Sequence, residues 1–246
     1  MANWGEIAAE YREFRPGYPA DLFASLAALP SHRSLAWDCG TGNGQAARGL
    51  AAYFDRVVAT DASPQQLQQA APCPNVEYLV ACAESCPLPD SSVDLIVVAQ
   101  ALHWFDLDRF YGEVCRVGRP GSILAATCYY EPSVNGAVDA VLARYQEMVR
   151  SYWPAGREWV DAGYRTIPFP FDELPMDRRQ LRLDTDLPRF LGYLNTWSAS
   201  RAYLKANGHE PLDSFDSDFA TAWGPAATVR TVTWQFNVRL GKVRPA

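Results

Sequence analysis

The sequence contains few histidines and methionines, three of each among 246 residues, and no long run of apolar residues. A helix that crosses a bilayer needs about 20 consecutive apolar residues, so we expect no membrane span and no membrane partner. The first residues carry neither the basic region nor the apolar stretch of a secretory signal. The formal net charge of −6 disfavours a nucleic-acid partner, because an acidic surface repels phosphate backbones.

A disulfide framework is missing as well. The six cysteines show no regular spacing, so we expect free thiols and a cytoplasmic location. Cys73, Cys82 and Cys86 follow one another at intervals of nine and four residues, which is not the spacing of a zinc knuckle, and we expect no metal site. The composition is that of a globular protein, with 48% hydrophobic and 20% charged residues.

The first half of the chain alternates short apolar runs with helical stretches. Such alternation is typical of βαβ units and a parallel sheet. The run at 93–99 is almost continuously apolar, as expected for a strand that is covered on both faces. We expect strands at 34–38, 56–60, 76–80, 93–99 and 122–127, and helices at 45–54, 65–71 and 110–117.

After about residue 131 the pattern changes to helical stretches separated by loops rich in proline and aromatic residues. An alternation of apolar and polar residues over 229–240 predicts a final strand. We expect helices at 134–152, 187–203 and 214–223 and a short strand at 179–183. The chain is interpreted as one domain, with an N-terminal flap and first helix (1–30), a cofactor-binding core (31–130), an inserted, mainly helical cap (131–228) and a final strand that returns to the sheet (229–246).

The strongest motif is Asp38-Cys39-Gly40-Thr41-Gly42-Asn43-Gly44, at the end of the first expected strand. Glycines there permit positive φ angles and let a ligand approach the backbone, and open α/β sheets bind ligands at this edge. The start of the next helix adds free N–H groups that suit a carboxylate. A tight turn without a ligand is the alternative interpretation.

The spacing of this motif indicates the kind of ligand. Dinucleotide-binding turns follow the pattern G-x-G-x-x-G, whereas this chain has G-x-G-x-G with Asp38 two residues before the first glycine. A carboxylate at that position would repel a pyrophosphate, but it is able to accept hydrogen bonds from an ammonium group. The motif therefore favours a zwitterionic ligand.

A second acidic residue, Asp61, ends the second expected strand, 23 residues after Asp38. In nucleoside-binding sheets an acidic side chain at this place meets the ribose hydroxyls. The alternative is a helix N-cap, because Asp61, Ser63 and Pro64 are also good helix-start signals. Because Asp61 occurs together with the glycine turn, a ribose contact is favoured over the helix N-cap.

Several segments together resemble a known family. The chain is similar to class I S-adenosylmethionine-dependent methyltransferases of the type 11 group and, within that group, to the trans-aconitate methyltransferase-like branch. The similarity is good over roughly residues 8–130 and weak afterwards, where Thr196-Trp197-Ser198 is a further but weaker match. The matching segments are 11–19, 38–44, 59–63, 83–84, 87–90, 94–96, 100–105 and 116–121.

The resemblance implies a doubly wound α/β fold with a mostly parallel, Rossmann-like sheet of seven strands, and S-adenosylmethionine as the cofactor. It implies that Gln100 lies beneath the methionine part, and that His103 and Trp104 face the transferred methyl group. The other expected cofactor contacts are Asp38, Gly40 and Gly42 at the methionine end, Asp61 at the ribose, Ala83 and Glu84 at the adenine, and Tyr11 and Arg15 from the N-terminal segment.

Some of these residues have simpler interpretations. Tyr11 is equally suited to plain packing, and Arg15 to an acidic substrate or a surface ion pair. His103 also fits a buried core histidine, and Trp104 a helix contact. The chain departs from the family at Gly118, where leucine is usual, and at Ser122, where a second glycine is common, which puts the local packing in question.

The expected activity is methyl transfer to a small organic acceptor, at oxygen rather than nitrogen or carbon. A carboxylate needs no base, whereas a hydroxyl needs a proton acceptor, for which His103 is the candidate because its ordinary pKa is near 6.5. Aromatic residues of the cap either shape an apolar acceptor cavity or form the core of the cap. The alternatives are a nicotinamide-dependent oxidoreductase and a catalytically silent cofactor-binding protein. The acceptor's identity and the oligomeric state stay open.

Overall fold

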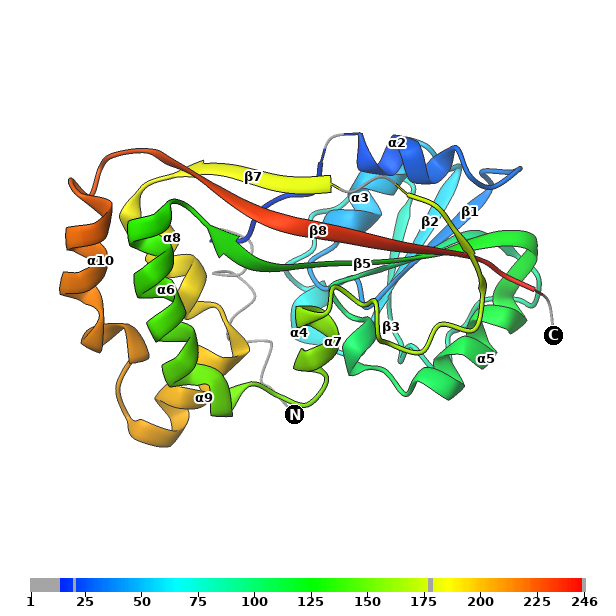
Figure 1. The fold of residues 1–246 in the computed structure, drawn as a ribbon. Helices are drawn as coiled ribbons and strands as arrows, with labels where there is room; N and C mark the ends of the chain where they lie inside the picture. Colours follow the sequence, from blue (N-terminus) through cyan, green and yellow to red (C-terminus); the bar gives the residue numbers. More distant parts are fainter. Residues whose placement is uncertain (1–13, 20, 177–178, 245–246) are drawn as a thin grey trace.

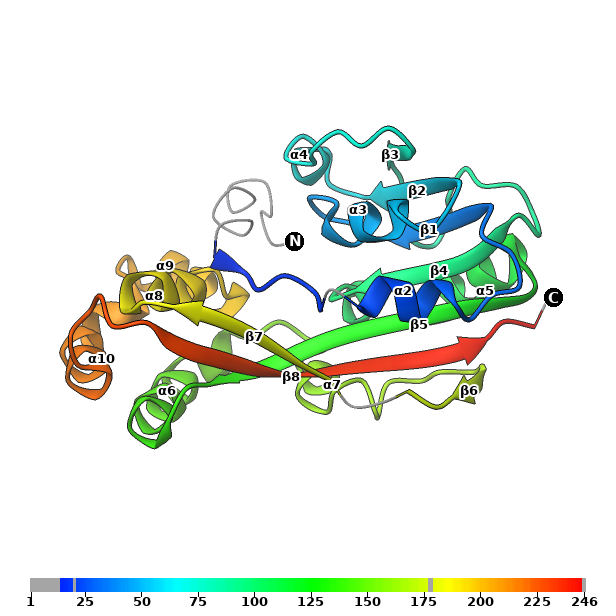
Figure 2. The ribbon, with the colours of Figure 1, turned by 90° about the horizontal axis from the view of Figure 1, so that it is seen from above.

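The computed structural model describes residues 14–19, 21–176 and 179–244. Over these ranges the chain forms one twisted sheet with helices packed against it (Figures 1 and 2). Within the described ranges the sheet has eight strands in the order β3-β2-β1-β4-β5-β8-β6, and β7 also pairs with β8. The strands are β1 (Leu35–Cys39), β2 (Arg56–Asp61), β3 (Val76–Val80), β4 (Val93–Ala99), β5 (Gly118–Ser133), β6 (Asp172–Leu174), β7 (Arg179–Thr185) and β8 (Arg230–Lys242).

Strands β1 to β5 are parallel, whereas β8 runs antiparallel to its three neighbours. The predicted fold class, a mostly parallel α/β sheet, is confirmed, but the predicted number of seven strands is one too few. The difference arises because the 13-residue β8 pairs with β7 along its first half and with β6 over its last three residues. A strand of three residues is too short to show an alternating pattern in the sequence.

Helices cover both faces of the parallel strands. Alternate residues of a strand point to opposite faces, and so Ala36 packs with the helices α2 and α3 while Trp37 packs with α5. Strands β1 and β4 are therefore buried on both sides, which explains their nearly continuous apolar sequence. The helices of this half are α2 (Leu22–Ala27), α3 (Gln45–Ala51), α4 (Pro64–Leu67) and α5 (Leu107–Val117).

The remaining helices gather mostly at one end of the molecule, where the long strands β5 and β8 extend beyond the parallel core (Figures 1 and 2). One cluster of buried side chains continues from α2 through β8 to α10. Within it the rings of Phe190 and Trp223 stack at 5.3 Å between centroids. These helices are α6 (Gly136–Val149), α7 (Arg157–Asp161), α8 (Leu187–Asn195), α9 (Ser198–Asn207) and α10 (Asp216–Trp223), with short 3-10 turns η2 (Arg150–Tyr152) and η3 (Pro211–Ser214).

The helix predicted over 187–203 is two helices. Between α8 and α9 the hydroxyl of Thr196 donates to the carbonyl oxygen of Tyr193 at 2.6 Å, and Trp197 is extended, with ψ at 139°. A threonine hydroxyl that bonds the preceding turn competes with the helical backbone pattern. The break places Thr196 and Trp197 at the end of β5, where the candidate site lies.

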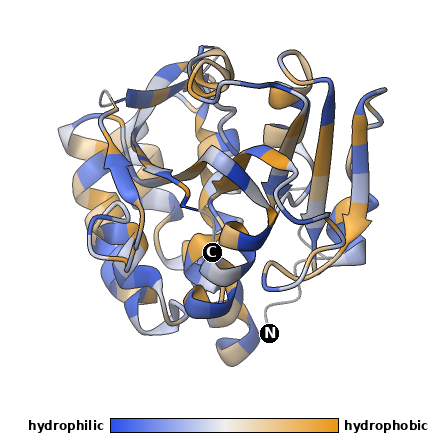
Figure 3. Cartoon of the chain, turned by 90° about the vertical axis from the view of Figure 1, so that its right-hand side faces the viewer, coloured by the Kyte–Doolittle hydropathy of each residue, from blue (hydrophilic) through white to orange (hydrophobic). Residues whose placement is uncertain are grey.

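Apolar residues follow the inner strands and the helix faces turned toward them (Figure 3). No helix in the described ranges is both long enough and apolar enough to cross a membrane.

Candidate active site

The glycine-rich turn follows β1 at the point where the strand order reverses. Strand β1 has β2 on one side and β4 on the other, and the carboxyl ends of all three lie at the same edge. The backbone N–H of Thr41 donates to the carbonyl oxygen of Thr60 at 2.9 Å, which holds the turn against the end of β2. Ligands of open α/β sheets bind at such a reversal.

Asp38 is fully buried at the end of β1. Its Oδ2 accepts a hydrogen bond of 2.5 Å from the Thr41 hydroxyl, while its Oδ1 is buried with no hydrogen-bond partner among the described residues. Burial raises the pKa of the Asp38 carboxyl from 3.8 to about 6. A buried carboxylate oxygen without a donor is costly, and an ammonium group would supply the missing hydrogen bond. The side chain therefore fits the amino end of S-adenosylmethionine.

Asp61 anchors the same turn from the end of β2. Its Oδ2 accepts from the N–H of Gly42 and its Oδ1 from the N–H of Ser63, both at 2.8 Å. The helix N-cap of α4 is Ser63, whose hydroxyl accepts from the N–H of Gln66 at 3.3 Å. Each carboxylate oxygen of Asp61 keeps a further lone pair for a ribose hydroxyl.

Two glycines of the turn differ in what surrounds them. Both have left-handed φ angles, +69° at Gly40 and +57° at Gly42. A Cβ on Gly40 would lie 2.7 Å from the Cβ of Ala101, so this glycine is required by protein packing. A Cβ on Gly42 would meet only the amide oxygen of Gln66, at 3.8 Å, which leaves open space for a ligand beside this backbone.

Ala83 and Glu84 lie just beyond β3. Ala83 is buried, and Oε1 of Glu84 accepts from the N–H of Asp106 at 3.0 Å, just before α5. This contact ties the loop after β3 to the loop after β4. The expected adenine contact of Ala83 and Glu84 stays a prediction.

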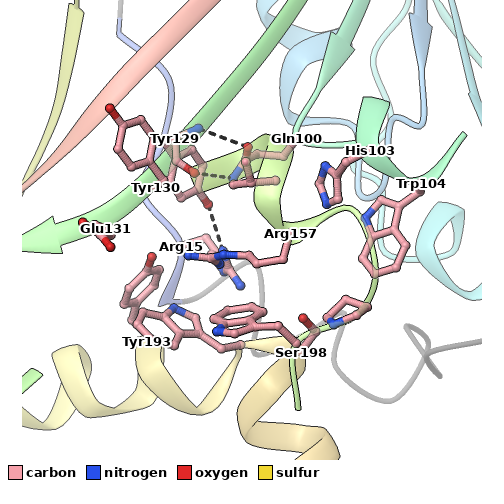
Figure 4. A pocket seen from close by; sticks show the side chains of 14 residues that line it. Arg15, Gln100, His103, Trp104, Tyr129, Tyr130, Glu131, Arg157, Tyr193 and Ser198 are labelled. Carbon is pink, nitrogen blue, oxygen red and sulfur yellow. Dashed lines mark hydrogen bonds between the residues drawn. The ribbon is translucent and has the colours of Figure 1, made fainter. Parts of the chain in front are cut away.

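Gln100, directly after β4, has a left-handed φ of +59°. Its amide group pairs with the backbone of Tyr129 on β5: Nε2 donates to the carbonyl oxygen at 3.0 Å, and the N–H of Tyr129 donates to Oε1 at 3.1 Å (Figure 4). Non-glycine residues rarely adopt positive φ, and here two hydrogen bonds hold the conformation. Gln100 is thus fixed at the base of a cavity.

This cavity lies between the ends of β4 and β5 and the helices of the second half. Polar side chains enter it from several elements: Arg15 from the N-terminal segment, His103 from the turn after β4, and Glu131 and Arg157 from β5 and α7 (Figure 4). Aromatic residues form most of the remaining wall, namely Trp104, Tyr129, Tyr130, Trp153, Tyr193 and Trp197.

His103 belongs to the 3-10 turn η1 (Leu102–Trp104) and is held by a tyrosine. Its Nδ1 lies 2.7 Å from the hydroxyl oxygen of Tyr164. Burial lowers the pKa of His103 from 6.5 to about 4, and the positive charge of Arg157 adds to the effect. The imidazole is therefore neutral at pH 7 and a weaker base than expected from the sequence. Trp104, 41% exposed, lies beside it at the rim.

Arg15 lies in the cavity and contacts the junction of α8 and α9. Its Nε donates to the Thr196 hydroxyl at 3.0 Å, one terminal nitrogen to the Thr196 carbonyl oxygen at 3.2 Å, and the other to the Tyr129 hydroxyl at 3.3 Å. The guanidinium group also lies over the Tyr193 ring, 5.1 Å from its centre. Tyr11, the other expected contact from this segment, lies outside the described residues.

The structure thus gathers Arg15, Gln100, His103 and Trp104 around one cavity and places the two aspartates at the neighbouring strand ends. No sequence pattern indicates Arg157 and Glu131, which reach the cavity only through tertiary packing. Tyr129 and Tyr130 were detectable, because they follow an expected strand at the carboxyl edge of the sheet. Among the described residues no three histidine, cysteine or acidic side chains cluster as a metal site would require.

Comparisons with known proteins agree with this geometry. A family model described as a methyltransferase domain matches residues 37–126. A Dictyostelium discoideum protein described as a methyltransferase is 32% identical over 226 residues, which cover 90% of this chain and 86% of the relative. A Mycobacterium tuberculosis protein, described as an uncharacterized methyltransferase, is 38% identical over 123 residues, half of each chain.

Among solved structures, an Anaeromyxobacter dehalogenans protein described as a type II methyltransferase superimposes with a TM-score of 0.87. It is 44% identical, and the match covers 95% of this chain and all of that one. The glycine turn, the strand order and these likenesses along nearly the whole chain lead to one conclusion: the chain belongs to the methyltransferase domain family.

Proposed function

We propose that this methyltransferase transfers the methyl group of S-adenosylmethionine to an oxygen atom of a small organic acceptor. The observation that carries the proposal is the position of the aromatic-walled cavity. It opens at Gln100 and His103, directly after β4, and β4 is the sheet neighbour of β1, which ends in Asp38 and the glycine turn. A cofactor on the turn and an acceptor in the cavity would meet at this edge.

Three groups of residues would hold the cofactor. The unpartnered Oδ1 of Asp38 suits its ammonium group, Asp61 its ribose hydroxyls, and Ala83 with Glu84 its adenine. The open space beside Gly42 leaves room for its methionine part. When bound, S-adenosylmethionine supplies an electrophilic methyl group on a sulfonium. The remaining task of the protein is to position an acceptor oxygen, and positioning alone is able to contribute about 7–11 kcal/mol.

Carboxylate oxygen is the acceptor that this site supports best. A carboxylate is already nucleophilic, whereas a hydroxyl must lose a proton. The pKa of His103, lowered to about 4, makes proton transfer to its imidazole less favourable by about 1.4 kcal/mol for each unit below the ordinary value. Arg15 and Arg157 both line the cavity (Figure 4). Arg157 is paired with Asp161 at 2.6 Å, and Glu131 adds a negative charge to the wall, so the attraction for an acid rests mainly on Arg15. Hydroxyl acceptors remain the second candidate.

The finer placement in the trans-aconitate methyltransferase-like branch is part of the same proposal, and its support is the sequence resemblance over the first half. A cytoplasmic location is also proposed. Its support is that all six cysteines are free thiols, as is usual in a reducing compartment.

Two measurements test the function. Isothermal titration calorimetry compares S-adenosylmethionine with NAD, and we expect heat of binding from the first only. A radiolabelled methyl-transfer assay then screens matched sets of small carboxylic acids, phenols and amines. We expect turnover with acids above phenols and amines. Binding of NAD, or turnover only with amines, would contradict the proposal.

A further inference from the structure

The hydroxyl group of Tyr164 lies against the ring of His103, in the turn η1 after β4. Tyr164 is almost fully buried just after α7, 61 residues beyond His103 in the sequence, and its hydroxyl oxygen lies 2.7 Å from Nδ1 of that histidine. The two rings are tilted by 46° with centroids 5.9 Å apart. Among the described residues, no other group hydrogen-bonds to the His103 ring.

The backbone that carries Tyr164 is strained. Gly163 and Tyr164 both have left-handed φ angles, +60° and +59°. For a tyrosine this conformation costs roughly 1–2 kcal/mol, and such strain persists only where the surroundings enforce it. Arg239 on β8 enforces it, because one guanidinium nitrogen donates to the carbonyl oxygens of Tyr164 and Ile167 at 2.8 and 2.7 Å.

The same segment also fixes the backbone of His103. Gly156, at the start of α7, packs so closely that a Cβ on it would lie 2.7 Å from the His103 carbonyl oxygen. The φ of Gly156 is +88°, which glycine alone adopts easily. The segment from Gly156 to Tyr164 thus touches His103 at its carbonyl and at its ring, and only the ring contact is a directed hydrogen bond.

We propose that Tyr164 is a positioning residue that donates its hydroxyl hydrogen to Nδ1 of His103, so that the ring hydrogen stays on Nε2 and is offered to an oxygen of the methyl acceptor. In a neutral imidazole one nitrogen donates and the other accepts, and the partner of one nitrogen decides the role of the other. A phenol is a good donor and a weak acceptor, which favours this direction. The part that concerns the acceptor rests on the proposed function.

In this arrangement His103 is a hydrogen-bond donor and takes no proton. The acceptor it suits presents an oxygen lone pair, as a carboxylate or carbonyl group does. For a carboxylate, one oxygen accepts from Nε2 while the other is free to attack. Burial and the nearby Arg157 keep the pKa of His103 low, which is consistent with a ring that stays neutral.

The tautomer is directly measurable without a substrate. The chain has only three histidines, His32, His103 and His209, so long-range 1H–15N spectra of a labelled sample show three imidazoles, and His103→Gln assigns one of them. We expect the hydrogen of His103 on Nε2 and no protonation above about pH 5. Tyr164→Phe should convert the ring to a mixture of tautomers. A hydrogen on Nδ1 in the wild type would overturn the proposal, whether or not the protein transfers methyl groups.

Kinetics test the consequence for catalysis. A glutamine side chain places an N–H donor near the position of Nε2, so His103→Gln should retain at least tenfold more kcat/KM for the acceptor than His103→Ala. Tyr164→Phe should lower the kcat/KM of the wild type about 5- to 10-fold, which is the effect expected from the loss of one neutral hydrogen bond. Its matched control is Tyr145→Phe, which removes a buried hydroxyl bonded to Ser200; the Tyr145 ring packs behind Trp197 but is not itself part of the cavity lining. Equal loss in both histidine variants, or in both tyrosine variants, would overturn the proposal.

Discussion

At the scale of one residue, the buried carboxyl group of Asp38 indicates a position for a ligand. The end of β1 buries its carboxyl group, and the protein satisfies only one of the two oxygens among the described residues. An unsatisfied buried oxygen destabilises the folded protein. The raised pKa of Asp38, about 6, expresses the same cost, since burial disfavours the charged form. A cationic ligand group would offset it.

The first prediction follows from this pKa. A ligand ammonium group binds the ionised carboxylate, so affinity for S-adenosylhomocysteine should rise as the pH rises through 6. With a pKa of about 6, roughly a tenth of the sites are ionised at pH 5, and the Kd should be about tenfold larger there than at pH 7.5. Calorimetric titration with S-adenosylhomocysteine at the two pH values measures this change in Kd.

Asp38→Asn is the control for that prediction, because the amide does not ionise. Its Kd should be weaker at pH 7.5 and nearly the same at pH 5 and pH 7.5. The Asp38 carboxyl should have the opposite effect on the free energy of unfolding, which should fall as the pH rises. Since the folded pKa is raised, the ligand-free wild type should lose stability relative to Asp38→Asn as the pH rises from about 4 to 6. An unchanged pH dependence in the variant would show that another group controls binding.

A second prediction concerns Gly118 and Ser122, where the sequence resemblance leads us to expect other residues. A Cβ on Gly118 would lie 2.6 Å from the Ser122 hydroxyl oxygen and 2.8 Å from the carbonyl oxygen of Val114. The serine therefore explains part of the need for glycine. Gly118→Ala should lower the free energy of unfolding by about 1–3 kcal/mol, and adding Ser122→Gly should restore part of it. Urea unfolding measures both, and additive losses would contradict the explanation.

At the scale of elements, the N-terminal segment is joined to the second half of the chain through Arg15. This guanidinium group bonds the α8–α9 junction at Thr196 and β5 at Tyr129. Residues 181 positions apart in sequence are thereby linked across the cavity. Arg15 lines the aromatic-walled cavity, and it also lines a second pocket together with Gln45 and Arg48, which follow the glycine turn. Its position therefore suits either an acceptor contact or the cofactor contact that the sequence suggested.

The third prediction separates these two roles. Arg15→Met keeps the length of the side chain but removes the charge and the donors. If Arg15 acts on the acceptor, kcat/KM for an acidic acceptor should fall at least tenfold while the Kd of S-adenosylhomocysteine changes less than about threefold. Arg33, a charged residue on the exposed loop before β1, offers a matched control as Arg33→Met. A large loss of cofactor affinity in Arg15→Met would instead support the original expectation.

At the scale of the whole molecule, the sequence predicts the first half better than the second. The expected bounds of β1 to β4 differ from the observed ones by no more than one residue. Covered parallel strands are apolar throughout, and glycine, proline and aspartate mark their ends. The family membership also removes the nicotinamide-dependent oxidoreductase as an interpretation.

The second half depends on contacts between distant residues. At the break between α8 and α9 the hydroxyls of Thr196 and Ser200 bond the carbonyl oxygens of Tyr193 and Leu194. Helix α7 has only five residues, too few for a helical period. His103 and Tyr164 are brought together by tertiary packing, which no local sequence pattern indicates. The strand ends of the candidate site were therefore predictable as positions. An aromatic cavity wall from the cap was one of two expected interpretations, and Trp153 and Trp197 line the cavity, whereas its charged residues Glu131 and Arg157 were not predictable.

The central claim is that a cofactor held at the ends of β1 and β2 meets an acceptor in the cavity at the ends of β4 and β5. A crystal structure with S-adenosylhomocysteine tests it most directly. We predict the ammonium group within hydrogen-bond distance of Asp38 Oδ1, the ribose hydroxyls on Asp61, and the sulfur facing the cavity beside Gln100 and His103. A ligand bound elsewhere, or a sulfur turned away from this cavity, would contradict the account.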